Sequence, residues 1–129
     1  MKYMSLFESL TRAKLKDCFV DDLKQTVFVV EENQIGKAIG RGGSNVKRLE
    51  SVLKRKVRII EFNSDLITFI KNLIYPIQAK GIEELDGTIT IQSPDLQSRG
   101  MLIGRNAQYL RNFERTVKRY FEIKEIKVI

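Results

Sequence analysis

Histidine is absent from the 129-residue chain, and cysteine occurs once, at Cys18. Without histidine the chain has no ordinary general base near neutral pH and no Ser-His or Cys-His nucleophile. A single cysteine without histidine also excludes a zinc site of thiolate or imidazole ligands. The composition therefore predicts a binding protein that is not an enzyme and that holds no metal and no cofactor.

Long hydrophobic segments are also missing. The longest apolar-rich run covers residues 66–74 and is too short to span a bilayer, and the N-terminus shows no signal peptide. Cys18 has no partner for an internal disulfide, and we expect it to be a small buried thiol on a strand. These features predict an intracellular, cytoplasmic protein that does not contact a membrane.

Positive charge is in excess, with 23 lysine and arginine residues against 16 aspartate and glutamate residues. The resulting net charge of +7 favours a polyanionic partner. Residues 37–58 contain eight of the cationic side chains and a single carboxylate, Glu50. A solvated helix face explains many charge runs, but this one surrounds three glycines in four positions, at residues 40–43.

The glycine-rich stretch Gly40-Arg41-Gly42-Gly43 lies between two short segments of helical periodicity. Glycine adopts a positive φ without a steric penalty, and a helix that starts at Ser44 or Asn45 has unpaired amides in its first turn. Such a helix end attracts anions, so the sequence predicts a site for a phosphate backbone. The predicted site comprises the loop residues Gly40, Arg41, Gly42 and Gly43, the cations Lys37, Lys47 and Arg48, and Ile35 and Ile39 as an apolar floor for bases.

Two better-known glycine loops do not fit this stretch. A Walker A loop needs Gly-Lys-Ser/Thr after a strand, whereas Gly40 is followed by Arg41-Gly42 and preceded by a helical segment. A dinucleotide-binding fingerprint needs a third glycine where this sequence has Asn45. An ordinary turn between two helices remains as the alternative.

The chain also repeats itself with a spacing of 64 residues, since Gly100-Met101-Leu102-Ile103-Gly104 follows the pattern of Gly36-Lys37-Ala38-Ile39-Gly40. Each half is predicted as helix, strand, strand, helix, glycine loop, helix, strand. In the first half we expect a helix that begins with a capping box at Ser5 and Glu8 and turns Leu6, Phe7 and Leu10 inward. We expect strands within 14–22, 26–30 and 56–62. The helix after the loop should turn Val46, Leu49, Val52 and Leu53 inward.

In the second half we expect a helix from residue 64 or 65 to Pro76, a hairpin of 82–85 and 88–91 with an Asp86-Gly87 turn, and a final strand containing Ile126 and Val128. The spacing of Leu66, Phe69, Ile70, Leu73 and Ile74 places them on one helical face. Aromatic side chains at helical or strand-face positions favour core packing over base stacking; these are Phe62, Phe69, Phe113, Tyr120 and Phe121.

The residues Ile35-Gly36, Ile39-Gly40, Gly43 and Val46 resemble the signature of the KH domain family, I-G-x-x-I/V-G-x-x-G-x-x-I/V. In that family the GXXG loop clamps the backbone of about four unpaired nucleotides. The hairpin before the loop matches the type II order, αββααβ. The resemblance therefore implies an α+β fold of two tandem type II KH units, each a three-stranded sheet packed on helices, at residues 1–63 and 64–129.

The second loop departs from this pattern, because Asn106 and Ala107 stand where the first loop has Gly42 and Gly43. Asparagine tolerates a positive φ, so we expect the turn to survive, whereas the methyl group of Ala107 lies where an RNA backbone would approach. The sequence leaves two alternatives open, a weaker RNA contact or a mere packing partner. The residues predicted for the weaker second site are Gly104, Arg105, Asn106 and Arg111.

Tandem type II units over the whole chain, together with residues 35–50 and the segment Phe7-Glu8-Ser9-Leu10-Thr11, resemble the archaeal NusA-like proteins of transcription elongation and termination. The resemblance implies binding of single-stranded RNA in elongation, pausing, termination or antitermination. It also implies the RNA polymerase elongation complex as a further partner. A ribosome-associated or ribosome-assembly KH protein is the alternative function, and an adaptor that binds only proteins is a third.

Overall fold

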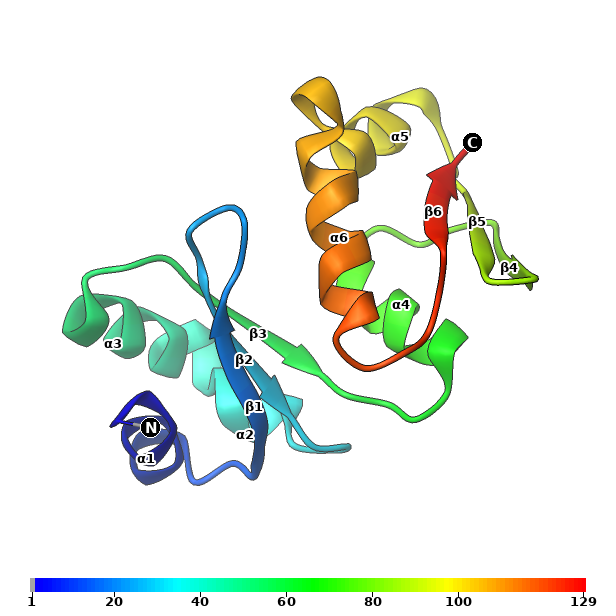
Figure 1. Cartoon of the computed structure of the whole chain (residues 1–129). Helices are drawn as coiled ribbons and strands as arrows, with labels where there is room; N and C mark the ends of the chain where they lie inside the picture. The colour runs from blue at the N-terminus through cyan, green and yellow to red at the C-terminus, as the bar shows by residue number, and fades with distance from the viewer. Residues whose placement is uncertain (1) are drawn as a thin grey trace. The chain divides into compact units, whose positions relative to one another are not determined.

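The computed structural model of the chain describes residues 2–129 (Figure 1). The chain divides into two compact units, Met1–Ser64 and Asp65–Ile129. Each unit has one three-stranded sheet and the element order helix, strand, strand, helix, helix, strand. The predicted αββααβ order is thus confirmed in both halves of the chain.

In the first unit the sheet has the order β1-β2-β3, with β1 antiparallel and β3 parallel to β2. Parallel strands cannot be joined by a tight turn and need a crossover. The two helices and the glycine loop between them supply that crossover, so the loop lies midway between two paired strands. The elements are α1 (Lys2–Thr11), β1 (Leu15–Val20), β2 (Thr26–Val30), α2 (Ile35–Ile39), a 3₁₀ turn (Arg41–Gly43), α3 (Ser44–Leu53) and β3 (Val57–Glu61).

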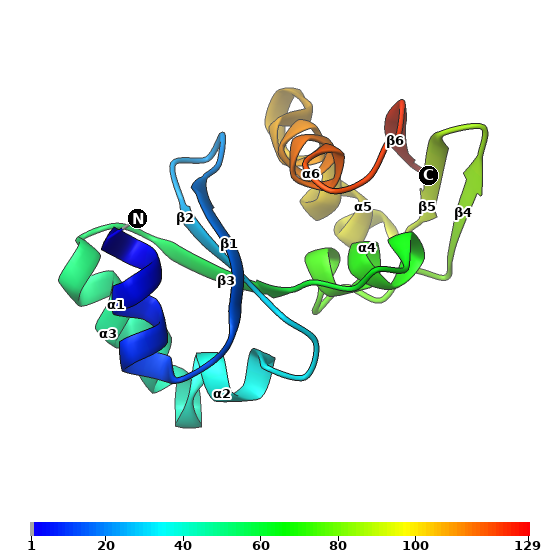
Figure 2. The same ribbon diagram turned by 60° about the horizontal axis from the view of Figure 1, so that its bottom comes forward.

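The core of the first unit lies between this sheet and its helices, as Figure 2 shows for α1 and α3. The rings of Phe7 on α1 and Phe28 on β2 stack with their centroids 4.4 Å apart, and both side chains are fully buried. Ala38 and Leu49 bring α2 and α3 onto the same cluster. Cys18 is buried on β1, as predicted.

Two expectations for the first unit were wrong. Helix α1 begins at Lys2, so Ser5 lies within it, and the carboxylate of Glu8 accepts instead from the amide of Leu15 at 3.2 Å. On α3, Val52 is 57 % exposed although Leu49 is fully buried. The helix presents only a narrow stripe to the core, and position 52 lies about 60° beyond that stripe at 100° per residue.

The second unit repeats this arrangement with the sheet order β4-β5-β6. On its first helix, Phe69, Ile70, Leu73 and Ile74 are buried, as the helical spacing predicted. Phe69 contacts the rings of Tyr120 and Phe121, each at 5.6 Å between centroids. The elements are α4 (Leu66–Ile74), β4 (Gly81–Leu85), β5 (Thr88–Gln92), α5 (Leu96–Ile103), a 3₁₀ turn (Arg105–Ala107), α6 (Gln108–Lys118) and β6 (Glu125–Val128).

A glutamate on each loop helix ties that helix to the last strand of its unit. The carboxylate of Glu50 accepts from the amide of Val57 at 3.1 Å, and that of Glu114 accepts from the amide of Ile126 at 2.7 Å. Glu50 and Glu114 stand 64 residues apart, at the same place in the repeat. These hydrogen bonds join α3 to β3 and α6 to β6, and so help to hold each loop helix against its sheet.

In the second unit, aspartates cap both helices that precede the loop helix. Asp65 accepts from the hydroxyl of Thr68 at 2.7 Å and from its amide at 3.0 Å, and Asp95 accepts from the amide of Ser98 at 2.7 Å. The hydroxyl and then the amide of Thr68 lower the pKa of Asp65, and the amide of Ser98 lowers the pKa of Asp95. Their contribution to stability is therefore complete above the unfolded pKa of about 3.9 and is lost as the pH falls through the folded pKa.

We expect Asp65→Asn/Asp95→Asn to weaken the acid sensitivity of the fold, because asparagine still caps a helix but does not titrate. Thermal unfolding followed by circular dichroism at neutral pH and at about pH 3 measures the effect. The melting temperature of the variant should fall less on acidification than that of the wild type. Equal falls in the two proteins would show that these two carboxylates contribute nothing to the pH dependence.

Candidate nucleic-acid interface

The first loop, residues 40–43, has a backbone that favours glycine. Gly40 has φ 77°, Gly42 has φ 61° and Gly43 has φ 76°. A side chain costs free energy in this left-handed region, and glycine does not. A Cβ atom built at Gly42 or Gly43 would meet nothing within 4 Å, so the loop exposes bare backbone to solvent. Another chain can therefore approach this backbone closely.

Helix α3 starts directly behind this bare backbone. Its N-cap, Gly43, has no side chain to bond the first amides, and Ser44 at the first helical position is exposed. The first amides of an α-helix have no partner within the helix and carry the positive end of its dipole. Because the amide of Ser44 donates to the carbonyl oxygen of Arg41 and that of Gly43 to the carbonyl oxygen of Gly40, an anion on the loop would be attracted chiefly by the positive end of the helix dipole.

Four of the predicted cations surround the loop. Lys37 on α2, Arg41 in the loop, and Lys47 and Arg48 on the first turns of α3 are all exposed. Within residues 2–129 none of the four is held in an ion pair. They are therefore available to a phosphate, Arg41 through a forked guanidinium and the lysines as point charges.

The remaining cations of the basic segment lie elsewhere. Lys54, Arg55 and Lys56 are exposed at the far end of α3, which is about 15 Å long. Arg58 is half-buried on β3, where burial lowers the pKa of its guanidinium and the charge of Asp21 partly opposes this. The exposed cations of residues 37–58 thus form two groups. The group at residues 37–48 lies at the loop, and the group at residues 54–56 lies at the opposite end of α3.

The predicted apolar floor lies on α2. Ile35 and Ile39 are both half-buried, and Ile35 packs against the core of the first unit. Gly36 between them is exposed, and a Cβ atom there would meet nothing within 4 Å. The helix therefore carries an apolar strip and a bare patch next to the loop. That bases rest on this strip stays a prediction.

One residue that holds the loop was not among the predicted site residues. The side-chain amide of Asn45 donates to the carbonyl oxygen of Lys37 at 3.1 Å and so joins the start of α3 to α2. A Cβ atom at Gly40 would come within 2.9 Å of the Asn45 side chain, which shows how closely the two pack. The sequence contains one hint of this role. In the 64-residue repeat the residue equivalent to Asn45 is Tyr109, so the two loops differ at this position.

The second loop, residues 104–107, has the same backbone conformation as the first. Gly104 has φ 73° and ψ 175°, against 77° and 172° at Gly40. Asn106 (φ 55°) and Ala107 (φ 59°) occupy the left-handed region like Gly42 and Gly43. The turn survives the loss of two glycines, as predicted.

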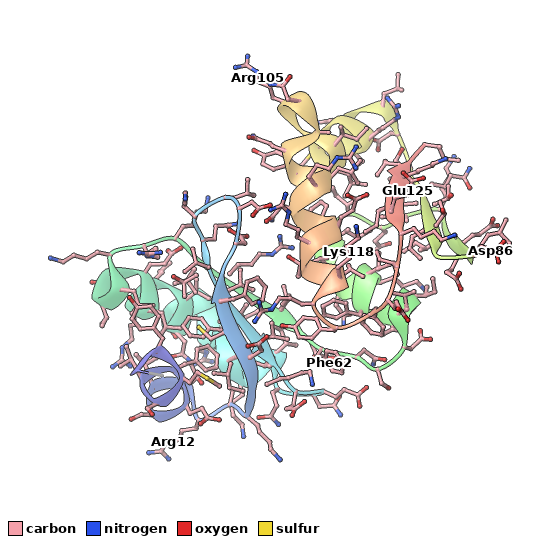
Figure 3. The ribbon with its side chains drawn as sticks, viewed as in Figure 1. Arg12, Phe62, Asp86, Arg105, Lys118 and Glu125 are labelled. Atoms are coloured by element: carbon pink, nitrogen blue, oxygen red, sulfur yellow. The ribbon has the colours of Figure 1, made fainter. Side chains whose placement is uncertain are left out.

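The charges around the second loop are fewer. Figure 3 shows the side chain of Arg105 pointing away from the ribbon at the turn between α5 and α6. Arg111 forms an ion pair with Glu114 at 3.0 Å, which draws it toward the anchoring carboxylate. Met101 stands at the position of Lys37 and is 56 % exposed. Of the predicted second-site residues, Arg105 is therefore the cation best placed for a phosphate.

Neither a metal site nor a membrane span is found in residues 2–129. No group of three or more cysteine and carboxylate side chains in this range is placed to hold a metal ion. No helix in the same range is long and apolar enough to cross a bilayer.

Comparison of the chain with known proteins identifies the family to which its fold belongs. The model of the KH domain matches residues 2–74, more than half of the chain and the whole first unit from its second residue onward. The crystal structure of APE1850 superposes on the chain with a TM-score of 0.80 at 26 % sequence identity, covering 99 % of this chain and 96 % of that one. The predicted α+β fold of two type II units is therefore confirmed.

Several relatives share one name, probable transcription termination protein NusA. The one from Methanocaldococcus jannaschii is 32 % identical over 132 residues, covering 98 % of this chain and 70 % of the relative. The one from Halococcus morrhuae is 28 % identical over 130 residues, and the alignment covers 99 % of this chain and 93 % of the relative. The one from Methanococcus vannielii is 46 % identical over 79 residues, but the aligned part is 45 % of that relative, less than half its length. The chain belongs to the KH domain family and, within it, to the archaeal NusA-like proteins.

Proposed function

We propose that the chain is a single-stranded RNA-binding protein of transcription, which clamps the RNA backbone at the first loop. The observation that supports this most is the bare, left-handed backbone of Gly42 and Gly43 at the start of a helix without a side-chain cap, with four exposed cations around it. The transcription context comes from the relatives, which are named as probable transcription termination proteins. Binding needs no catalytic group, and we propose no enzymatic activity.

Each residue of the first site has a role in this proposal. A phosphate lies against the bare backbone of Gly42 and Gly43, at the positive end of the α3 dipole. Arg41 forks onto the same or the next phosphate, and Lys37, Lys47 and Arg48 add attraction. Gly40 makes the turn, and Ile35 and Ile39 lie under the bases.

The second unit makes the weaker contact in this proposal. Its loop keeps the backbone conformation of the first, so Gly104, Arg105 and Asn106 can contact RNA. Arg111 contributes less, because Glu114 already engages its guanidinium. We propose one KH module in each unit, the first with the intact loop and the second with the altered one.

A cytoplasmic location and contact with the RNA polymerase elongation complex follow as parts of the same proposal. The alternative, a ribosome-associated KH protein, is tested by crosslinking to nascent transcripts against co-sedimentation with ribosomal subunits. The names of the relatives favour transcription.

The dependence of RNA affinity on salt tests the proposal directly. If four phosphates are neutralised, log K falls with log salt at a slope of about −3, so affinity for single-stranded RNA drops about fiftyfold between about 50 and about 200 mM salt. Filter binding or fluorescence anisotropy measures it, with a duplex of the same sequence as the control. A slope near zero, or equal affinity for the duplex, would contradict a clamp on unpaired RNA.

A further inference from the structure

We propose that the second loop takes a nucleobase of single-stranded RNA, which stacks on Tyr109 beside Met101. This deepens the proposed function and rests on it. The first loop offers bare backbone and four cations to a phosphate, whereas the second keeps the backbone conformation but carries apolar side chains at the positions of Lys37, Gly43 and Asn45. The two units would then recognise different parts of RNA, the backbone and a base.

Three substitutions between the loops replace charged, bare or polar positions by apolar groups, although Ile35 and Gly42 correspond to the polar residues Arg99 and Asn106. The 64-residue repeat aligns Lys37 with Met101, Gly43 with Ala107 and Asn45 with Tyr109. A charge, a bare backbone position and a polar side chain have become a thioether, a methyl group and an aromatic ring. The backbone conformation is unchanged, so these side chains stand where the phosphate-binding groups stand in the first unit.

The ring of Tyr109 lies directly on the loop. A Cβ atom built at Gly104 would come within 2.5 Å of Cδ2 of Tyr109, so one side of the ring covers the glycine backbone. Tyr109 nevertheless remains 38 % exposed, and Met101 on the last turn of α5 is 56 % exposed. Gly100, between Met101 and Arg99 on α5, is exposed and a Cβ atom there would meet nothing within 4 Å.

These groups suit a base better than a phosphate. Aromatic side chains stack on unpaired bases with little sequence preference, and the flexible thioether of methionine adapts to a flat partner. Arg105, four residues before Tyr109, points away from the ribbon (Figure 3) and carries the charge that the phosphate of the same nucleotide requires. The apolar surface of Tyr109 and Met101, with the cations Arg105 and Arg99 nearby in the chain, fits one nucleotide.

The absence of tryptophan from the chain allows a direct test. Tyr109→Trp introduces a single fluorophore at the proposed stacking position. We expect single-stranded RNA to quench its emission, and an abasic oligomer of the same length to leave it nearly unchanged. Tyr75→Trp is the matched control, because Tyr75 is 72 % exposed in the same unit at the C-cap of α4, outside the loop. Its emission should not respond to either oligomer.

Affinity gives the second arm of the test. In the Arg41→Asp/Gly42→Asp background, which silences the first loop, Tyr109→Ala should weaken RNA binding about fivefold and Tyr109→Phe should restore it. Thermal melts establish that the variants fold.

If RNA binds to the Tyr109→Trp protein without changing its emission, base stacking is overturned while the proposed function stands. If RNA binds to neither wild type nor variants, both are overturned. Equal quenching by the abasic oligomer would assign the second loop to the backbone and also overturn the inference.

Discussion

The double substitution Arg41→Asp/Gly42→Asp should lower the affinity for single-stranded RNA at least tenfold. Both positions are exposed, so the new carboxylates stay in water and face the phosphate that the loop would hold. The change removes one positive charge and adds two negative ones at the centre of the proposed clamp. Aspartate also tolerates the left-handed region better than most residues, so the φ of 61° at Gly42 does not force the loop to rearrange.

The second loop provides the matched control, since Asn106 already occupies the left-handed region with φ 55° at the position equivalent to Gly42. Arg105→Asp/Asn106→Asp makes the same type of change there and should reduce affinity less than threefold, because that loop makes the weaker contact. Gly42→Asn separates the added side chain from the added charge. Anisotropy with a labelled oligomer measures binding, and thermal melting monitors the fold. Unchanged affinity in a folded first-loop variant would place the RNA elsewhere.

Phe7→Ala should destabilise the first unit by about 3–5 kcal/mol, the usual cost of removing a fully buried ring. Phe7 is the contact between α1 and the centre of the sheet, because its ring stacks on Phe28 at 4.4 Å. Alanine would leave a cavity between two rigid elements that cannot close around it. Such a loss is a large part of the stability of a small domain.

Chemical denaturation followed by circular dichroism measures this effect. The matched control is Val52→Ala, which also removes apolar atoms but from a side chain that is 57 % exposed on α3. We expect that change to stay within about 0.5 kcal/mol of the wild type. If the two variants lose similar stability, the core of the first unit is not centred on the Phe7–Phe28 pair.

The sequence determined the local features of this protein. Three glycines in four positions indicate a left-handed turn, because a positive φ costs other residues free energy. All three glycines have a positive φ. Asp86-Gly87 predicted a hairpin turn, and both residues have the positive φ that such a turn needs. The helical spacing of residues 66–74 selected the buried face of α4. Each of these depends on neighbours in the chain, and the 64-residue repeat then extended the order of elements to the second unit.

Tertiary structure decided what depends on distant residues. Position 52 satisfies the helical pattern as well as position 49 does, but only packing against the sheet buries Leu49 and exposes Val52. Ala107 is held in a conformation that alanine avoids, because the flanking helices α5 and α6 fix the ends of its turn. The tie from Asn45 to Lys37 and the tie from Glu114 to Ile126 join groups that no local pattern connects. Burial and hydrogen bonding are set by the whole surrounding fold, so these contacts became visible only when the helices and the sheet were in place.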